Sequence, residues 1–156
     1  MKKKISFLLS EEIQEHQHVL KETDLALKRK IPEVIKLITK TLNSNKKILV
    51  VGNGGSAADS IHFSAELAGK FKSKKRKPLK CISLAENIST ITAIGNDFDF
   101  ESIFSRQLEA IGQKGDLLIG ISTSGLSKNI NKAIMQAKKI NISTFGLFGQ
   151  NITKTT

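Results

Sequence analysis

The sequence predicts an α/β fold built on a doubly wound parallel sheet. Two apolar runs, Ile48–Val51 and Leu117–Ile119, are near-continuous rather than alternating, as expected for parallel strands that helices cover on both faces. From residue 46 onward, strand patterns alternate with helix patterns, which is typical of a parallel sheet. The 156 residues, 39% of them apolar, suffice for one domain with its own core.

Two helices are expected before the first strand, and together they predict a helical hairpin over residues 1–45. The first covers 10–28, where Ser10 can cap the helix and two glutamates suit its first turn. The second begins at Ile31-Pro32 and ends before the polar Asn43–Asn45 segment. Because this hairpin is not needed to complete a sheet, we expect it to make subunit contacts.

Over residues 46–156 strands are expected to alternate with helices, with two helices between the second and third strands. The predicted strands are 47–52, 79–84, 116–122 and 143–148, and the predicted helices are 56–70, 88–94, 101–111 and 127–140. Ligands of such sheets bind at the carboxyl ends of the strands. The segments that follow the strands are therefore where we look for a site.

A glycine turn, Gly52-Asn-Gly-Gly-Ser56, joins the first strand to its helix. Asn53, Gly54 and Gly55 allow a ligand to approach the backbone, and the N–H groups at the helix start favour an anion. The turn lacks the full G-x-G-x-x-G spacing and a Walker lysine, which disfavours a dinucleotide or a nucleoside triphosphate. A tight turn that binds nothing is an equal alternative.

A serine-rich turn, Ser122-Thr-Ser-Gly-Leu-Ser127, follows the third strand. It carries four hydroxyls, at Ser122, Thr123, Ser124 and Ser127, where two would suffice to cap a helix. Hydroxyls and main-chain amides can together hold a phosphate monoester without a metal. We therefore favour a phosphate site over a capped turn.

His62 and Glu66 are spaced i, i+4 on the helix after the glycine turn, so they face the same way. We place them at the carboxyl edge of the sheet. An imidazole and a carboxylate suit zinc, and the carboxylate can also move a proton. Two ligands do not complete a zinc site, and His16 and His18 have no evident reason to converge on it. A salt-bridged helix face remains the alternative.

Asn96 and Asp97 form a further polar turn, in which Asp97 could accept hydrogen bonds from sugar hydroxyls. An Asx turn that breaks the helix is the simpler interpretation of this segment by itself. The single cysteine, Cys81, lies in an alternating run and is interpreted as a buried thiol rather than a nucleophile.

The net charge of +11 raises the possibility of nucleic-acid binding, with its densest cluster between Lys70 and Lys80. Only Phe71 interrupts that cluster as an aromatic, and no known nucleic-acid module is present, so a solvated loop is preferred. The apolar run near the N-terminus is about five residues, too short for a signal peptide. We expect a cytoplasmic protein without a membrane span.

Four segments closely resemble the phosphoheptose isomerases of the sugar-isomerase (SIS) domain family, namely Val51–Asp59, His62–Glu66, Ala93–Asp97 and Gly120–Gly125. The resemblance covers residues 1 to about 150. It implies a SIS-type, flavodoxin-like sandwich with five parallel strands, and a homotetramer with sites between subunits. It also implies conversion of sedoheptulose 7-phosphate into D-glycero-D-manno-heptose 7-phosphate, which would feed lipopolysaccharide or capsule in a Gram-negative bacterium.

The resemblance also assigns roles to individual residues. Zn²⁺ would bind to His62 and Glu66, and Glu66 would be the catalytic base that also contacts substrate. The phosphate would be held by Ser122, Thr123, Ser124 and Ser127, and the rest of the substrate would be lined by Asn53, Gly54, Gly55, Asn96 and Asp97.

Two departures from the family are evident. Relatives continue with a strand and a long helix that supplies a glutamine and a histidine to the zinc site, and Gln150–Thr156 contains neither that helix nor the histidine. We therefore expect a C-terminally incomplete core, in either a truncated or a shortened protein, with little activity and weak zinc retention. Lys70 stands where many relatives have arginine, which preserves charge but not bidentate recognition of phosphate.

The competing class is a SIS protein that binds without catalysis, as a replication-initiator partner or a sugar-phosphate sensor. Such binders are expected to lack a carboxylate at position 66, which is present here. No DNA-binding module accompanies the SIS motifs in this sequence.

Overall fold

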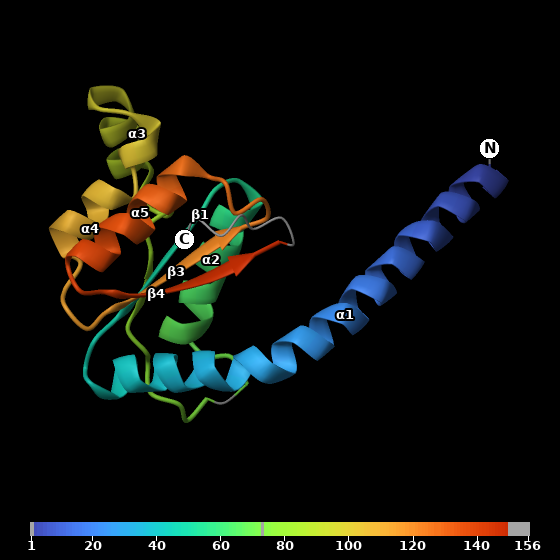
Figure 1. The fold of residues 1–156 in the computed structure, drawn as a ribbon, viewed down its shortest axis with the longest axis horizontal. Helices are drawn as coiled ribbons and strands as arrows, with labels where there is room; N and C mark the ends of the chain where they lie inside the picture. The colour runs from blue at the N-terminus through green and yellow to red at the C-terminus, as the bar shows by residue number, and fades with distance from the viewer. Residues whose placement is uncertain (1, 73, 150–156) are drawn as a thin grey trace. The chain divides into compact units, whose positions relative to one another are not determined.

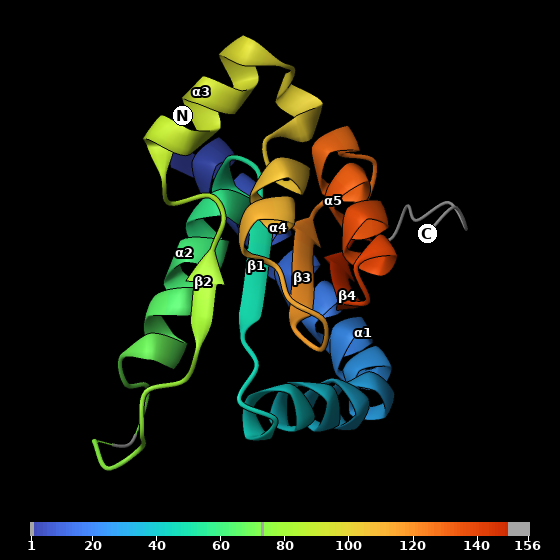
Figure 2. The ribbon, with the colours of Figure 1, turned by 90° about the vertical axis from the view of Figure 1, so that its left-hand side faces the viewer.

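A computed structural model describes residues 2–72 and 74–149 (Figure 1). It contains a four-stranded parallel sheet in the order β2-β1-β3-β4 (Figure 2). The strands are β1 (Ile48–Gly52), β2 (Cys81–Ser83), β3 (Leu117–Ser122) and β4 (Ser143–Phe148). The helices that follow β1 are α2 (Gly55–Ala68), α3 (Ile88–Asp97), the 3₁₀ turn η1 (Phe100–Ser102), α4 (Ser105–Ile111) and α5 (Lys128–Lys139). The predicted α/β class and parallel sheet are confirmed.

The central strands β1 and β3 are buried on both faces, as their continuous apolar runs predicted. Every residue of β1 is buried, and the first four residues of β3 are buried as well. Leu49 and Leu118 are paired neighbours and belong to the core that α4 and α5 cover. On the opposite face, Ser60 of α2 shares a 2.7 Å hydrogen bond with Ser83 of β2. Helices therefore cover both faces, as Figure 2 shows.

A buried ion pair ties the starts of the two central strands together. Asp116 is 0% exposed, and its carboxylate accepts hydrogen bonds from the Lys47 Nζ (2.6 Å), the Lys47 N–H (3.0 Å) and the Gln113 N–H (2.8 Å). Both carboxylate oxygens are thus satisfied, which is the condition for burying a charge without a large penalty. This contact fixes β1 beside β3 and so aligns the turns at their far ends.

The predicted hairpin over residues 1–45 is wrong: residues Lys2–Asn43 form one continuous helix, α1. No glycine or polar turn separates the two expected helices between Leu27 and Ile31, and Pro32 has a fixed φ that a helix tolerates near −65°. The chain divides into two compact units, Met1–Leu37 and Ile38–Thr156. The first unit exposes many apolar side chains, among them Phe7, Leu9 and Leu20.

Two further sequence expectations are qualified by the described residues. The helix predicted over 101–111 begins as the separate turn η1 and continues as α4. None of the described helices is both long and apolar enough to cross a membrane. Gln150–Thr156, the segment on which the expected departure from the family rests, lies outside the described residues.

Candidate active site

The glycine turn and the serine turn lie side by side at one edge of the sheet. In the register between β1 and β3, Gly52 pairs with Ile121, so Asn53 and Ser122 are the next residues of two neighbouring parallel strands. Helix α2 begins at Gly55 and helix α5 at Lys128. Two helix N-termini therefore approach the same edge, and their free N–H groups favour an anion there.

The serine turn is closed by its own hydroxyls. Ser122 is 5% exposed, and its Oγ accepts from the Gly125 N–H (3.1 Å) and lies 3.3 Å from the Ser127 Oγ. The Ser124 Oγ accepts from the Leu126 N–H at 3.2 Å. Gly125 has φ +66°, a conformation that favours glycine. Thr123 and Ser124 are exposed and Ser127 is half-buried, so the turn presents hydroxyls on a shaped loop.

The glycine turn is tight because no larger residue fits where it begins. A Cβ on Gly52 would lie 2.2 Å from the Ser56 carbonyl oxygen. Gly54 has φ +53° and stands at the N-cap of α2 without a side-chain cap, and its carbonyl accepts from the Ala57 and Ala58 N–H groups. A Cβ on Gly54 or Gly55 would meet open space. The backbone here is therefore accessible to a ligand.

A pair of asparagine side chains joins the two turns. The Asn53 Nδ2 donates to the Asn129 Oδ1, and the Asn129 Nδ2 donates to the Asn53 Oδ1, each at 2.8 Å. Asn129 is 3% exposed and its Oδ1 also accepts from the Ile130 N–H at 2.9 Å. The sequence interpretation missed Asn129. An amide beside Ile130 at the start of an amphipathic helix was the signal available.

His62 and Glu66 do face the same way on α2, but their expected position at the carboxyl edge is wrong. The Leu67 carbonyl, beside Glu66, accepts from the Leu79 N–H, which lies just before β2 begins. Glu66 is ten residues beyond Ser56, and a helix rises about 1.5 Å per residue. The backbone of Glu66 therefore lies about 15 Å along α2 from that of Ser56, toward the amino ends of the strands, because α2 returns antiparallel to them (Figure 2).

The pair itself is incompletely satisfied. The His62 Nε2 lies 3.8 Å from the Glu66 Oε1, with 77% of the histidine side chain and 35% of the glutamate side chain exposed. The Glu66 Oε2 is buried and has no hydrogen-bond partner among the described residues. A buried carboxylate oxygen without a partner carries a desolvation cost. A metal ion or a bound hydroxyl would remove that cost.

The backbone that carries Glu66 is held by an arginine from the basic loop. The Arg76 guanidinium donates to the carbonyls of Glu66 (2.8 Å), Leu67 (2.9 Å), Gly69 (3.1 Å) and Lys77 (2.9 Å). Three of these carbonyls, at Glu66, Leu67 and the C-cap Gly69, lie at the C-terminal end of α2, where a cation is favourable. The loop expected to be merely solvated therefore contains a helix cap. Lys70, the departure from the family, is exposed.

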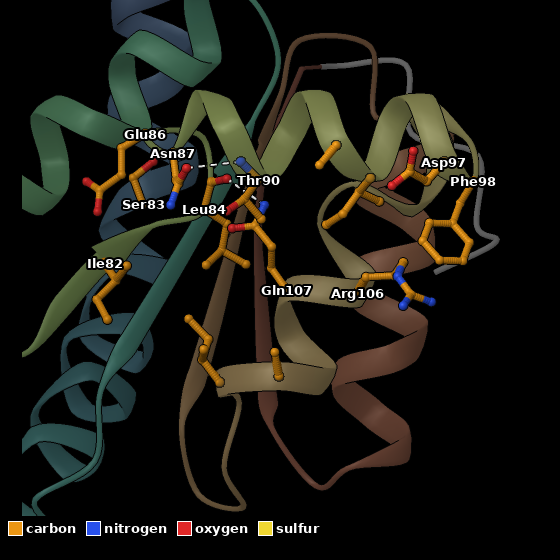
Figure 3. A pocket seen from close by; sticks show the side chains of 14 residues that line it. Ile82, Ser83, Leu84, Glu86, Asn87, Thr90, Asp97, Phe98, Arg106 and Gln107 are labelled. Carbon is orange, nitrogen blue, oxygen red and sulfur yellow. Dashed lines mark hydrogen bonds between the residues drawn. The ribbon is translucent and has the colours of Figure 1, made fainter.

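Asn96 and Asp97 are the last two residues of α3. In the chain, η1, α4 and β3 lie between them and the serine turn. The Asn96 Nδ2 donates to the Asp97 Oδ1 at 2.9 Å, and both residues are exposed. Asp97 lines a cavity of about 490 Å³ between the end of β2, α3 and α4, shown in Figure 3. At its rim the Arg106 guanidinium stacks on Phe98 at 3.7 Å. Asp97 thus faces space that a polar ligand could enter.

The side chains of His62 and Glu66 have the chemistry of two zinc ligands. A neutral imidazole and a carboxylate are suitable ligands, and a Glu66 Oε2 without a hydrogen-bond partner among the described residues is consistent with such a role. No group of three His, Cys, Asp or Glu residues within 2–72 and 74–149 could hold a metal ion. Cys81 supplies no reactive thiolate, because burial raises the pKa of its thiol to about 12. The donor set fits zinc as two ligands.

The chain is similar in sequence to a known domain family and to several known proteins. The SIS domain family matches residues 12–149. The chain is 47% identical over 143 residues to a phosphoheptose isomerase of Geotalea daltonii and 48% identical to one of Campylobacter jejuni. These matches cover 92% of this chain and 74% and 76% of those relatives.

Solved structures agree with the sequence matches. The structure of a phosphoheptose isomerase from Neisseria gonorrhoeae superimposes with a TM-score of 0.77 and is 35% identical, covering 92% of this chain and 76% of that one. A phosphoheptose isomerase from Francisella tularensis superimposes with a TM-score of 0.76 at 36% identity, covering 83% of this chain and 66% of that one.

Proposed function

The chain belongs to the SIS domain family and is an aldose–ketose isomerase of a phosphorylated heptose, and we propose that Glu66 is the base of its reaction. The reaction converts sedoheptulose 7-phosphate into D-glycero-D-manno-heptose 7-phosphate. The observation that carries the role of Glu66 is its partly exposed carboxylate, whose buried Oε2 has no hydrogen-bond partner among the described residues. A carboxylate whose charge is not fully satisfied by donors of its own chain can take up a substrate proton.

The chemistry requires only proton transfers. A proton leaves C1 of the ketose to Glu66, the C2 carbonyl oxygen gains a proton, and an enediol forms. A proton then returns to C2 while the C1 hydroxyl loses its proton, which yields the aldehyde. The proton counts balance, so no oxidant or reductant is needed. One carboxylate at C1 and C2 and an opposing acid at the oxygens suffice.

We assign the phosphate to the serine turn. Ser122, Thr123, Ser124 and Ser127 surround the N-terminus of α5, a helix of 12 residues whose N-cap residue Ser127 makes no side-chain cap bond. Its first N–H groups and the hydroxyls can together bind three outer phosphate oxygens. Asn53, Gly54, Gly55, Asn96 and Asp97 are proposed to contact the sugar carbons and hydroxyls.

The site is proposed to be assembled between subunits of a homotetramer. The serine turn and Glu66 lie toward opposite ends of α2 and the sheet, which a seven-carbon sugar phosphate within one chain would have to span. A second copy could instead present its α2 to the serine turn of the first. The exposed apolar side chains of α1 are proposed as further subunit contacts.

Zn²⁺ is proposed to bind to His62 and Glu66, with the remaining ligands from outside the described residues. When bound, zinc would polarise oxygen atoms of the substrate or hold the local geometry. His62 would then orient the Glu66 carboxylate, and Arg76 would fix the helix end that carries it. We propose that the reaction takes place in the cytoplasm and supplies heptose for lipopolysaccharide or capsule.

The proposed function is tested by incubating the purified protein with sedoheptulose 7-phosphate in D₂O. We expect the aldose product to form with deuterium at C2, because a proton held by a carboxylate exchanges with solvent. Fructose 6-phosphate, a ketose phosphate one carbon shorter, is the control and should react far more slowly. Product without deuterium would contradict the enediol route, and equal rates would contradict the heptose assignment.

A further inference from the structure

We propose that Asn129 is a positioning residue, which fixes the side-chain amide of Asn53 in one orientation toward the substrate. This inference rests on the proposed role of Asn53 as a sugar contact, and it adds a residue to which no role has been assigned. Asn129 is separated from Asn53 by 76 positions and reaches it through two 2.8 Å hydrogen bonds.

The orientation of Asn129 is set by the main chain. The Ile130 N–H donates to the Asn129 Oδ1 at 2.9 Å. Only the oxygen of an amide side chain can accept that hydrogen bond, because the Nδ2 group is a donor. A flipped Asn129 would place two donors against each other in a buried site, where an unpaired donor is costly. Asn129, at 3% exposure, therefore has a single stable orientation.

The orientation of Asn53 follows from that of Asn129. In the reciprocal pair each oxygen faces the other residue's nitrogen. A flip of Asn53 alone would oppose oxygen to oxygen and nitrogen to nitrogen. The Ile130 N–H therefore fixes the amide orientation of Asn129, and Asn129 in turn fixes that of Asn53. Asn53 retains one N–H and one oxygen lone pair in fixed directions. Asn53 is half-buried, so these remaining groups can reach a ligand at the turn.

A mere tether between the two turns is a weaker explanation. Two apolar side chains could hold the turns together without burying amides that need partners. The reciprocal pair gives in addition a defined donor and a defined acceptor beside the glycine turn. That is what a site needs in order to distinguish one arrangement of sugar hydroxyls from another, since an unpaired polar group in a built site is strongly disfavoured.

The test is a double-mutant cycle of Asn53→Ala and Asn129→Ser, measured as the KM and kcat of the purified protein for sedoheptulose 7-phosphate. Serine is tolerated near a helix start and is too short to reach Asn53. We expect each single variant to raise KM roughly ten-fold with kcat within about two-fold, as for the loss of one oriented hydrogen bond. The KM of the double variant should also rise roughly ten-fold, because both substitutions remove the same contact.

Three comparisons keep a structural effect separate. Affinity for inorganic phosphate, measured by calorimetry, should change less than two-fold in Asn129→Ser. Ser60→Ala removes another buried side-chain hydrogen bond and should lower the melting temperature with an unchanged KM. Asn129→Leu, similar in volume, should repeat the KM effect if Asn129→Ser fails to fold.

Multiplicative losses of roughly a hundred-fold in the double variant would overturn the positioning role, since independent sites add in free energy. So would an unchanged KM in the Asn129 variants, or an equal loss of phosphate affinity. Absence of turnover by the wild-type protein would instead overturn the proposed function, and the positioning role with it. Wild-type turnover combined with multiplicative losses would leave the proposed function intact.

Discussion

The two turns at the carboxyl edge and the His62–Glu66 pair differ in how fully their polar groups are satisfied. In the turns, hydroxyls and amides bond to one another, as in the Ser122 contact with Gly125 and the reciprocal asparagine pair. On α2 the Glu66 Oε2 is buried without a partner within the described residues. The turns are therefore preorganised by this chain, whereas the pair needs something added.

That difference separates two kinds of contribution to catalysis. A preorganised turn binds a group that is the same in substrate and product, such as the phosphate. An unsatisfied carboxylate is available for the atoms that change. Buried polar groups without partners are rare in proteins and concentrate where function requires them. Asn131 Oδ1, near the serine turn, is the other side-chain atom of this kind in the described part of the chain.

The largest expected effect is on the turnover rate when Glu66 is substituted. Glu66→Gln should lower kcat about 1000-fold, within the usual range for loss of a general base, and change substrate affinity less than three-fold. Steady-state kinetics and calorimetric binding check the two halves of this statement. Turnover retained in Glu66→Gln would remove Glu66 from the base role.

Zinc should act on the same pair. Titration of the wild-type protein with Zn²⁺ to about 100 times its Kd should raise the free energy of unfolding by about 2.7 kcal/mol. The increase should be smaller in His62→Ala, which removes one ligand and keeps the carboxylate. Thermal unfolding followed by circular dichroism measures both. An equal increase in the two proteins would place the metal elsewhere.

Loss of the buried hydroxyl of the serine turn should lower the free energy of unfolding. Ser122→Ala removes the acceptor of the Gly125 N–H and the contact to Ser127, so we expect a loss of about 2 kcal/mol in the free energy of unfolding. Ser124→Ala is the matched control, because its hydroxyl is exposed and its loss should cost less than about 0.5 kcal/mol. Urea unfolding compares them. Equal losses would mean that the turn is not held by its buried hydroxyl.

The smallest expected effect is a gain in stability when the Glu66 carboxylate is removed. Glu66→Met, without added metal, should stabilise the protein by about 1 kcal/mol, because it removes a buried oxygen that has no hydrogen-bond partner among residues 2–72 and 74–149. The carboxylate would then be a group whose presence lowers stability in favour of activity. Urea unfolding in the presence of a chelator measures this change. Destabilisation would show that Glu66 makes a structural contact.

Much of the fold was predictable because it depends on local patterns. The continuous apolar runs of β1 and β3 require burial on both faces, and the glycines and hydroxyls of the turns require a strand-to-helix reversal. The hairpin predicted over residues 1–45 was wrong, because Pro32 was interpreted as the start of a second helix. No turn residues precede Pro32, and α1 continues through it. A proline fixes φ in the helical range and does not by itself begin a helix.

The sequence by itself determined the class of fold, the order of elements, the residue types at the turns and the spacing of His62 and Glu66. Only the tertiary structure decided that Asn129 meets Asn53, that Arg76 caps α2, and that Glu66 lies away from the carboxyl edge. The physical reason is that periodicity and turn chemistry act over a few residues. Contacts across 76 positions depend on strand register and on the direction in which a helix returns.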